Sequence, residues 1–168
     1  KLLNSELDFI RNMSIPNINL NNKYETVFIE FRWFQHIEYL VRNTIIKLPN
    51  WSHTIICGNK NHLKIQEMVN SISNKIKLIK LNIDNLTPST YSRLLMNEDF
   101  WNNFVGDKIL LYQEDSYLFH NKIEQFLEYD YIGAPWPKKQ DDNKYGVGNG
   151  GFSLRTKSKM IKVIKNIK

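Results

Sequence analysis

The stretch Lys108-Ile-Leu-Leu-Tyr-Gln-Glu-Asp-Ser-Tyr-Leu-Phe119 carries the clearest indication of the fold. Residues 109–112 form a short continuous apolar run, which is typical of a strand buried on both faces of a sheet. The run ends at the polar residues 113–116. In open α/β sheets ligands bind outside the carboxyl ends of the strands, so Asp115 is a candidate site residue. The alternative is a loop acid that accepts hydrogen bonds from backbone N–H groups at a turn.

The sequence before this stretch alternates between apolar runs and amphipathic segments. Strands are predicted at residues 27–29, 53–57 and 76–81, and the last, being less uniformly apolar, is expected near an edge of the sheet. Apolar residues spaced by three and four predict helices after the first two strands. Thr87 and Pro88 suit the N-cap and first position of a third helix, and that segment continues through residue 104. This alternation predicts an α/β fold, Rossmann-like, with a mostly parallel sheet flanked by helices.

The pattern changes after Asp115. A short strand is expected at residues 117–119, a short helix at 123–127, a strand at 152–155 and a final amphipathic helix. We expect residues 1–22 to be a lead-in segment of undetermined order and residues 23–168 to be one domain. The chain begins at Lys1 and ends within a helical pattern, which suggests a domain cut short at its carboxyl end.

Composition narrows the class of protein. The chain has 168 residues, 42% of them hydrophobic and 24% charged, as in ordinary globular domains. Its single cysteine, Cys57, lies in an apolar run, so we expect a buried thiol. No apolar stretch approaches the roughly 20 residues that span a bilayer, and no signal-peptide pattern is present, so we expect a cytoplasmic, intracellular protein without a membrane span. The net charge of +6 suits an anionic ligand such as a nucleotide. Nucleic acid is not expected as a partner, because lysine is scattered and arginine is scarce.

The glycine-rich segment at residues 146–151 needs separate treatment. Gly146, Gly148 and Gly151 match the spacing of the dinucleotide-binding fingerprint. That fingerprint requires a strand before it and a helix after it, whereas here a polar loop precedes it and a predicted strand follows. We therefore reject a nicotinamide or flavin site. Glycines can still let the backbone approach a ligand closely, and the alternative is a flexible hairpin connection.

Two motifs in this order, Gln113-Glu-Asp-Ser116 and Asn149-Gly-Gly-Phe-Ser-Leu-Arg155, resemble those of GT-A-like glycosyltransferases. The resemblance covers most of the chain from about residue 27. It implies transfer of a sugar from a nucleotide-sugar donor, expected to be a UDP-sugar, to an acceptor hydroxyl on a glycan or protein. It also implies Mn²⁺ or Mg²⁺ at the donor diphosphate, where a cation would stabilise the leaving group.

The resemblance also implies roles for particular residues. Asp115 would be the metal ligand and a catalytic residue, although Gln113 stands where a D-x-D motif has its first acid. Asn149 would be catalytic and Trp136 would lie on the acceptor side. The residues implied in donor binding are Glu30, Arg32, Arg93, Glu114, Asp115, Gly150 and Gly151.

Alternatives remain for several of these residues and for the function. Glu30 and Arg32 could form a surface ion pair, and Trp136 could be a core residue. The catalytic base would lie beyond residue 168 or be Asp141 or Asp142. The alternative function is a non-catalytic module that binds a nucleotide-sugar or a partner.

Overall fold

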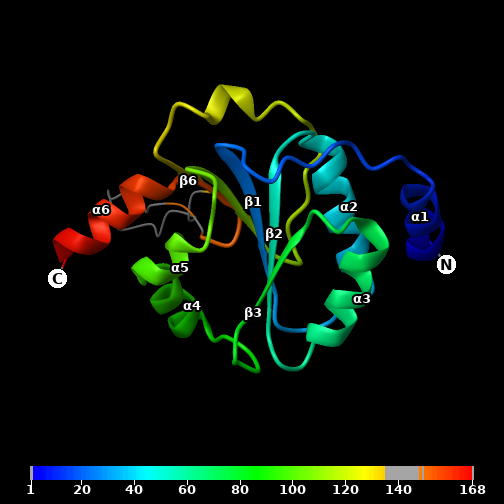
Figure 1. The fold of residues 1–168 in the computed structure, drawn as a ribbon, viewed down its shortest axis with the longest axis horizontal. Helices are drawn as coiled ribbons and strands as arrows, with labels where there is room; N and C mark the ends of the chain where they lie inside the picture. Colours follow the sequence, from blue (N-terminus) through cyan, green and yellow to red (C-terminus); the bar gives the residue numbers. More distant parts are fainter. Residues whose placement is uncertain (1, 135–147, 149, 168) are drawn as a thin grey trace, which may run out of the picture.

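The computed structural model describes residues 2–134, 148 and 150–167. A sheet lies between two groups of helices (Figure 1), which confirms the predicted fold class. One face is covered by α2 (Ile37–Lys47) and α3 (His62–Ile72), with α1 (Leu2–Arg11) packed against α2. The other side carries α4 (Pro88–Leu95), α5 (Glu98–Asn102) and α6 (Lys157–Ile167). None of the described helices is long and apolar enough to cross a bilayer.

The six strands of the described residues follow the order β3-β2-β1-β4-β6-β5. They are β1 (Tyr24–Ile29), β2 (Ser52–Cys57), β3 (Lys77–Lys80), β4 (Lys108–Tyr112), β5 (Tyr131–Gly133) and β6 (Ser153–Thr156). The chain runs outward from β1 through β2 to β3, which is an edge strand as predicted, and then returns to place β4 on the other side of β1. These four strands are parallel, whereas β6 is antiparallel to both β4 and β5. The strand order therefore reverses between β1 and β4.

The alternation of side chains along β1 separates two apolar layers. Phe28 packs with residues of α2 and α3, whereas Val27 and Ile29 pack on the other face with residues of α4, α5 and α6. Trp101 on α5 is fully buried in this second layer, and its indole Nε1 donates a hydrogen bond to Leu95 O at 2.8 Å. This bond ties α5 to the end of α4, so the helices beside the carboxyl end of β1 are held as a unit.

Local capping explains where the helices on that side begin. Thr87 is the N-cap of α4, as predicted, and its Oγ1 accepts a hydrogen bond from Thr90 N at 3.2 Å. Thr90 Oγ1 accepts one from Thr87 N at 2.7 Å, which completes a capping box. The segment that follows does not continue as one helix, because Asn97 caps a new one, α5, by accepting from Asp99 N at 2.9 Å.

Three segments differ from the sequence-based expectation. Residues 117–119 form no strand, so that prediction is wrong. The helix expected at residues 123–127 is a single 3-10 turn, Glu124–Phe126. Within the lead-in segment, α1 is an ordered helix whose Arg11 Nε donates to Glu38 Oε1 of α2 at 2.9 Å. Hydrogen bonding by Arg11 is the main reason that the pKa of Glu38 is lowered. This contact fastens to the domain a segment whose order the sequence pattern did not reveal.

A buried carboxyl group links three parts of the sheet. Glu25 on β1 is 1% exposed, and its Oε1 accepts a hydrogen bond from Thr54 Oγ1 of β2 at 2.6 Å. Its Oε2 accepts one from Gly106 N at 2.7 Å, just before β4. A Cβ at Gly106 would lie 2.6 Å from Glu25 Cβ, so glycine is needed there for space. Glu25 therefore helps to set how β1, β2 and the entry to β4 meet.

Candidate functional site

A pocket of about 600 Å³ opens at the carboxyl end of β1 on the side of the sheet that carries α4 and α6. Glu30, Phe31 and Arg32, which follow β1, line it together with Gln113, which follows β4. The strand order reverses between these two strands, and such a reversal point is where open α/β sheets bind ligands. Of the polar residues that follow β4, Gln113 lines the pocket and Asp115, the candidate from the sequence, does not.

The turn after β1 is organised by Glu30. Its carboxyl group is 4% exposed, and its Oε1 accepts hydrogen bonds from Phe31 N and Arg32 N, both at 2.9 Å. Arg32 then folds back on it, with Nε 2.9 Å from Oε1 and Nη2 3.0 Å from Oε2. This bidentate pair is of the strong, charge-assisted kind. Glu30 therefore holds the turn in shape, and its negative charge is offset by Arg32.

Glu114 and Asp115 lie beside the pocket and not among its lining residues. Glu114 contacts Arg32 Nη2 at 3.4 Å and His36 Nε2 at 3.1 Å, so its carboxyl group connects the turns after β1 and β4. Asp115 is exposed, and its one hydrogen bond within the described residues is with Ser116 Oγ at 3.4 Å. The hydrogen bond with Glu30 raises the pKa of Arg32 most, and the charge of the nearby Asp115 raises it further.

The antiparallel direction of β6 brings the glycines to the same edge of the sheet. Ser153, at the start of β6, is paired with Leu111, near the end of β4. A segment that precedes β6 therefore lies beside residues that follow β4, and Gly150 and Gly151 line the pocket. Tyr91 of α4 donates a hydrogen bond from its hydroxyl to Gly150 O at 3.2 Å, which fixes this backbone against the pocket wall. Burial raises the pKa of Tyr91 to about 12, so the hydroxyl stays protonated as a donor.

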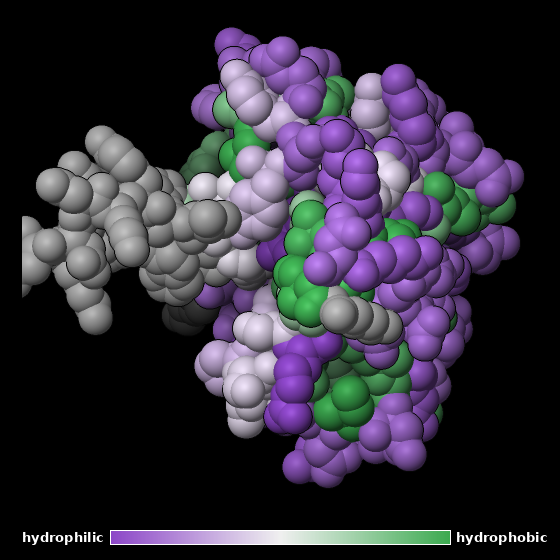
Figure 2. All heavy atoms as spheres, turned by 90° about the vertical axis from the view of Figure 1, so that its left-hand side faces the viewer, coloured by the Kyte–Doolittle hydropathy of each residue, from purple (hydrophilic) through white to green (hydrophobic). Residues whose placement is uncertain are grey.

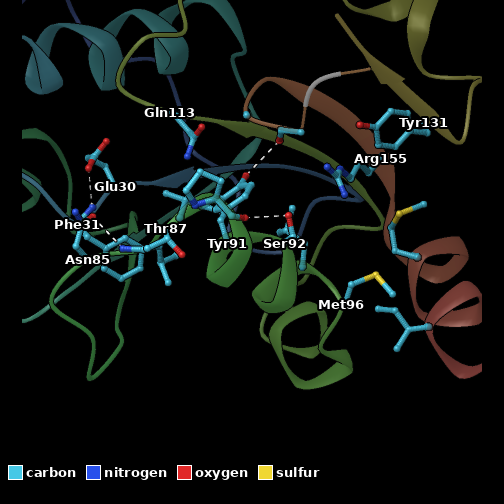
Figure 3. A pocket seen from close by; sticks show the side chains of 18 of the residues that line it. Glu30, Phe31, Asn85, Thr87, Tyr91, Ser92, Met96, Gln113, Tyr131 and Arg155 are labelled. Carbon is cyan, nitrogen blue, oxygen red and sulfur yellow. Dashed lines mark hydrogen bonds between the residues drawn. The ribbon is translucent and has the colours of Figure 1, made fainter. Parts of the chain in front are cut away.

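Arg155 of β6 forms the wall opposite the β1 turn. Figure 3 shows Arg155 beside Tyr131 on one side of the pocket, Glu30 and Gln113 on the other, and Tyr91 between them. The guanidinium carbon of Arg155 lies 4.8 Å from the centroid of the Tyr131 ring. Its Nε donates to Ser153 Oγ at 3.0 Å. Burial lowers the pKa of Arg155 from its ordinary value.

The remaining wall is apolar. Met96 at the end of α4 and Met160, Val163 and Ile164 on α6 line this part of the pocket. Met96 and Val163 are each 48% exposed, so the apolar wall reaches the surface. Figure 2, which faces this side of the molecule, shows hydrophobic side chains gathered among hydrophilic ones. The pocket thus has a polar end at the strand termini and an apolar end between α4 and α6.

The structure brings together only some of the residues implied from the sequence. Glu30, Arg32, Gly150 and Gly151 line the pocket, whereas Arg93 is exposed and is not among the lining residues. Asn149, Trp136 and the two candidate bases, Asp141 and Asp142, lie outside the described residues.

Sequence reasoning gave no role to the pocket residues Tyr91, Tyr131 and Arg155, although Arg155 is the last residue of the second motif. Their role depends on the antiparallel placement of β6, which no spacing along the chain reveals. It also missed His36, whose ring contacts Glu114 from the start of α2.

The side chains available to a metal ion are few. No group of three or more His, Cys, Asp and Glu side chains among the described residues could hold one. Glu114 is engaged by Arg32 and His36, which leaves Asp115 as the carboxylate without an ion-pair partner in the described part of this region. One such carboxylate fits a cation that takes a single ligand from the protein and its other ligands from phosphate oxygens and water.

Comparison with solved structures identifies the class of fold. The chain superimposes on 4-diphosphocytidyl-2C-methyl-D-erythritolsynthase from Anaerococcus prevotii with a TM-score of 0.59 and 6% sequence identity, over 88% of this chain and 77% of that one. A second similar structure is the apo-form glycosyltransferase GlyE of Streptococcus pneumoniae. There the TM-score is 0.49 and the identity 14%, over 87% of this chain and 37% of that one. The fold is thus the Rossmann-like α/β type shared with the synthase.

The chain belongs to the family described as "Protein of unknown function (DUF5672)", whose family model matches residues 75–168. No curated protein sequence matches it. The matched region contains β4, β6 and α6, and hence the pocket residues Gln113 and Arg155. The turn after β1 lies outside that region.

Proposed function

We propose that this protein is a glycosyltransferase that binds a nucleotide diphosphate-sugar, with uridine as the expected base, in the pocket between the ends of β1 and β4. The observation that carries the proposal is the position of this pocket, where the strand order reverses, between residues after β1 and residues after β4. Its volume of about 600 Å³ suits a ligand of nucleotide-sugar size. The motif resemblance supports sugar transfer, because Gly150 and Gly151 of the second motif line this pocket.

The fold supports the nucleotide part of the proposal by analogy. The synthase that shares the fold is named for a diphosphocytidyl compound, which is a nucleotide diphosphate. One fold hosts many functions, so the proposal depends on the residues that line the pocket.

In the proposed reaction an acceptor hydroxyl attacks the anomeric carbon of the sugar and gives up its proton to a base. The bond between that carbon and the diphosphate oxygen breaks, and the nucleoside diphosphate leaves. A divalent cation, Mn²⁺ or Mg²⁺, held on the protein side by Asp115, would offset charge on the diphosphate. We assign Arg32 to donor binding, and the Glu30 carboxyl group keeps its guanidinium in place at the strand ends. Gly150 lets the backbone come close to the ligand.

A bulky side chain introduced into the pocket tests whether uridine diphosphate binds there. Ser92 is an exposed residue of α4 that lines the pocket, so Ser92→Trp should block uridine diphosphate binding with Mn²⁺ present. Ser89 is also exposed on α4 but does not line the pocket, so Ser89→Trp is the matched control and should bind as the unmodified protein does. Calorimetric titration measures both. Equal binding by the two variants would show that the nucleotide binds elsewhere.

The metal and the activity need separate experiments. Asp115→Ala should abolish the Mn²⁺-dependent part of uridine diphosphate binding, whereas Asp99→Ala, at an exposed acid on α5, should not.

Release of uridine diphosphate from UDP-sugars, measured in the presence of candidate acceptors, tests sugar transfer. Donor binding without any turnover would favour the second candidate, a non-catalytic nucleotide-sugar-binding module. That candidate is favoured by the sparse set of metal ligands.

A further inference from the structure

Arg155 is a buried cation without an opposite charge among the described residues. Its exposed fraction is 8%, close to the 7% of Arg42, yet Arg42 is paired with Glu38 at 2.9 Å. Arg11 and Arg32 also pair with carboxyl groups, whereas none of the ion pairs within the described ranges includes Arg155. Burying an unpaired charge is costly, so such a group usually has a partner or a function.

The described neighbours of Arg155 only partly offset its charge. The aromatic rings of Tyr131 and Trp101 lie 4.8 Å and 5.9 Å from its guanidinium carbon, which offers partial compensation through the ring electrons. Of its five N–H donors, only the one on Nε has a hydrogen-bond partner in the described structure, Ser153 Oγ. Within residues 2–134, 148 and 150–167 the terminal nitrogens thus have no hydrogen-bond partner, and they belong to the pocket wall, where Figure 3 shows the side chain.

The glycine motif makes room for these terminal nitrogens. A Cβ at Gly150 would lie 2.9 Å from Nη2 of Arg155. The carbonyl oxygen of Gly150 already accepts hydrogen bonds from Tyr91 and from Ser153, each at 3.2 Å. The backbone thus leaves space next to the guanidinium without neutralising it. A planar guanidinium with free donors is suited to bind two oxygens of a phosphoryl or carboxylate group at once.

We propose that Arg155 is the oxyanion-binding residue of the pocket and that its terminal nitrogens bind a phosphoryl or carboxylate group of the ligand. The identity of that ligand rests on the proposed function: the oxyanion is the diphosphate of the nucleotide-sugar, or a carboxylate on the sugar itself. The resemblance had implied Arg93 in donor binding, but Arg93 is not among the residues that line the pocket, whereas Arg155 is.

The test is calorimetric titration of the full chain with three probes: inorganic pyrophosphate, glucuronate and uncharged uridine. Arg155→Met removes the charge but keeps apolar bulk, and we expect it to weaken oxyanion binding by about tenfold or more. Lys162→Met is the matched control, because Lys162 is an exposed cation on α6 next to the pocket-lining Val163. It should change oxyanion affinity less than about twofold if general electrostatics are screened. Loss of pyrophosphate binding identifies the diphosphate as the source, and loss of glucuronate binding identifies a sugar carboxylate.

Uridine separates this inference from the proposed function. Arg155-dependent oxyanion binding without uridine binding would keep the inference and reject the nucleotide. Uridine binding together with unchanged oxyanion affinity in Arg155→Met would reject the inference and keep the nucleotide. Loss of oxyanion binding in Arg93→Met but not in Arg155→Met would also overturn the inference.

Two further variants guard against a purely structural role. Arg155→Lys keeps the charge without the planar fork and should bind the oxyanion with intermediate affinity. Gly150→Ala should weaken oxyanion binding by displacing Nη2. The melting temperature of ligand-free Arg155→Met should be equal to or above that of the unmodified protein, because an unpaired buried charge is removed. A purely structural role would give two results together. The melting temperature of Arg155→Met would fall below that of the unmodified protein, and Arg155→Lys and Gly150→Ala would both bind the oxyanion with full affinity.

Discussion

At the scale of single residues, Glu25 shows how a buried polar group depends on its partners. Glu25→Gln replaces one accepting oxygen by an NH₂ group, so Thr54 Oγ1 or Gly106 N loses its acceptor. A buried donor left without a partner costs about 1–3 kcal/mol, and we expect a loss of that size in the free energy of unfolding. Urea unfolding measures it. The control is Glu67→Gln at an exposed position of α3, which should change stability by less than about 0.5 kcal/mol.

Equal unfolding free energies for Glu25→Gln and Glu67→Gln would contradict the assignment of both hydrogen bonds to Glu25.

The burial of a side chain could be predicted from the sequence where the residues next to it in the chain decide its surroundings. Cys57 was expected to be buried because it ends an apolar run, and it is 0% exposed. Burial raises its pKa to about 11, so the thiol stays protonated. The role of Arg155 could not be predicted in the same way. Whether an arginine is paired depends on which carboxyl groups the fold brings near it, and no pattern along the chain specifies that.

At the scale of elements, the N-cap of α4 holds the helix that carries Tyr91. Thr87→Ala removes the acceptor of Thr90 N, and the loss of such a cap costs about 1 kcal/mol. We also expect weaker binding of nucleotide, since α4 is one wall of the pocket. Thermal unfolding and calorimetry measure the two effects. Ser89→Ala, on the same helix with an exposed side chain, should leave both within error.

Unchanged stability in Thr87→Ala would mean that water replaces the capping oxygen without loss.

The elements themselves were predictable where a local signal exists. Apolar runs located β1, β2 and β4, and the Thr87-Pro88 pair located the start of α4. The expected strand at residues 117–119 has apolar side chains but no neighbouring strand to pair with, so propensity alone misled. The helix α1 was not predicted because its position depends on Arg11 reaching Glu38, a contact 27 residues apart in the chain.

At the scale of the whole molecule, His53 makes stability depend on pH. It lies in β2 with its Nδ1 2.7 Å from Thr26 Oγ1, and its Nε2 has no hydrogen-bond partner in the described structure. Burial lowers the pKa of His53 to about 3, against 6.5 for the free side chain. Between pH 6.5 and pH 3, His53 is therefore protonated in the unfolded chain and neutral in the folded protein. The stability that neutral His53 provides is complete above pH 6.5 and falls as the pH drops toward 3.

The expected slope from this one group approaches about 1.4 kcal/mol per pH unit in that range. Urea unfolding at pH 7, 6 and 5 measures it. His53→Gln should be less stable at pH 7, because its amide is buried, but should show a smaller loss between pH 7 and pH 5. An identical pH dependence in the two proteins would assign the effect to other groups.

The edge position of β3 has a consequence for how the protein behaves at high concentration. An open edge strand offers unpaired backbone groups to any other chain, and natural proteins often place lysines there to prevent it. β3 begins and ends with exposed lysines, Lys77 and Lys80, in a strand of four residues. If β3 of a second molecule paired with this edge, the lysines of the two β3 strands would repel each other. The lysine-rich composition that suggests an anionic partner thus also keeps sheets of neighbouring molecules apart, and replacing both lysines by valine would favour self-association.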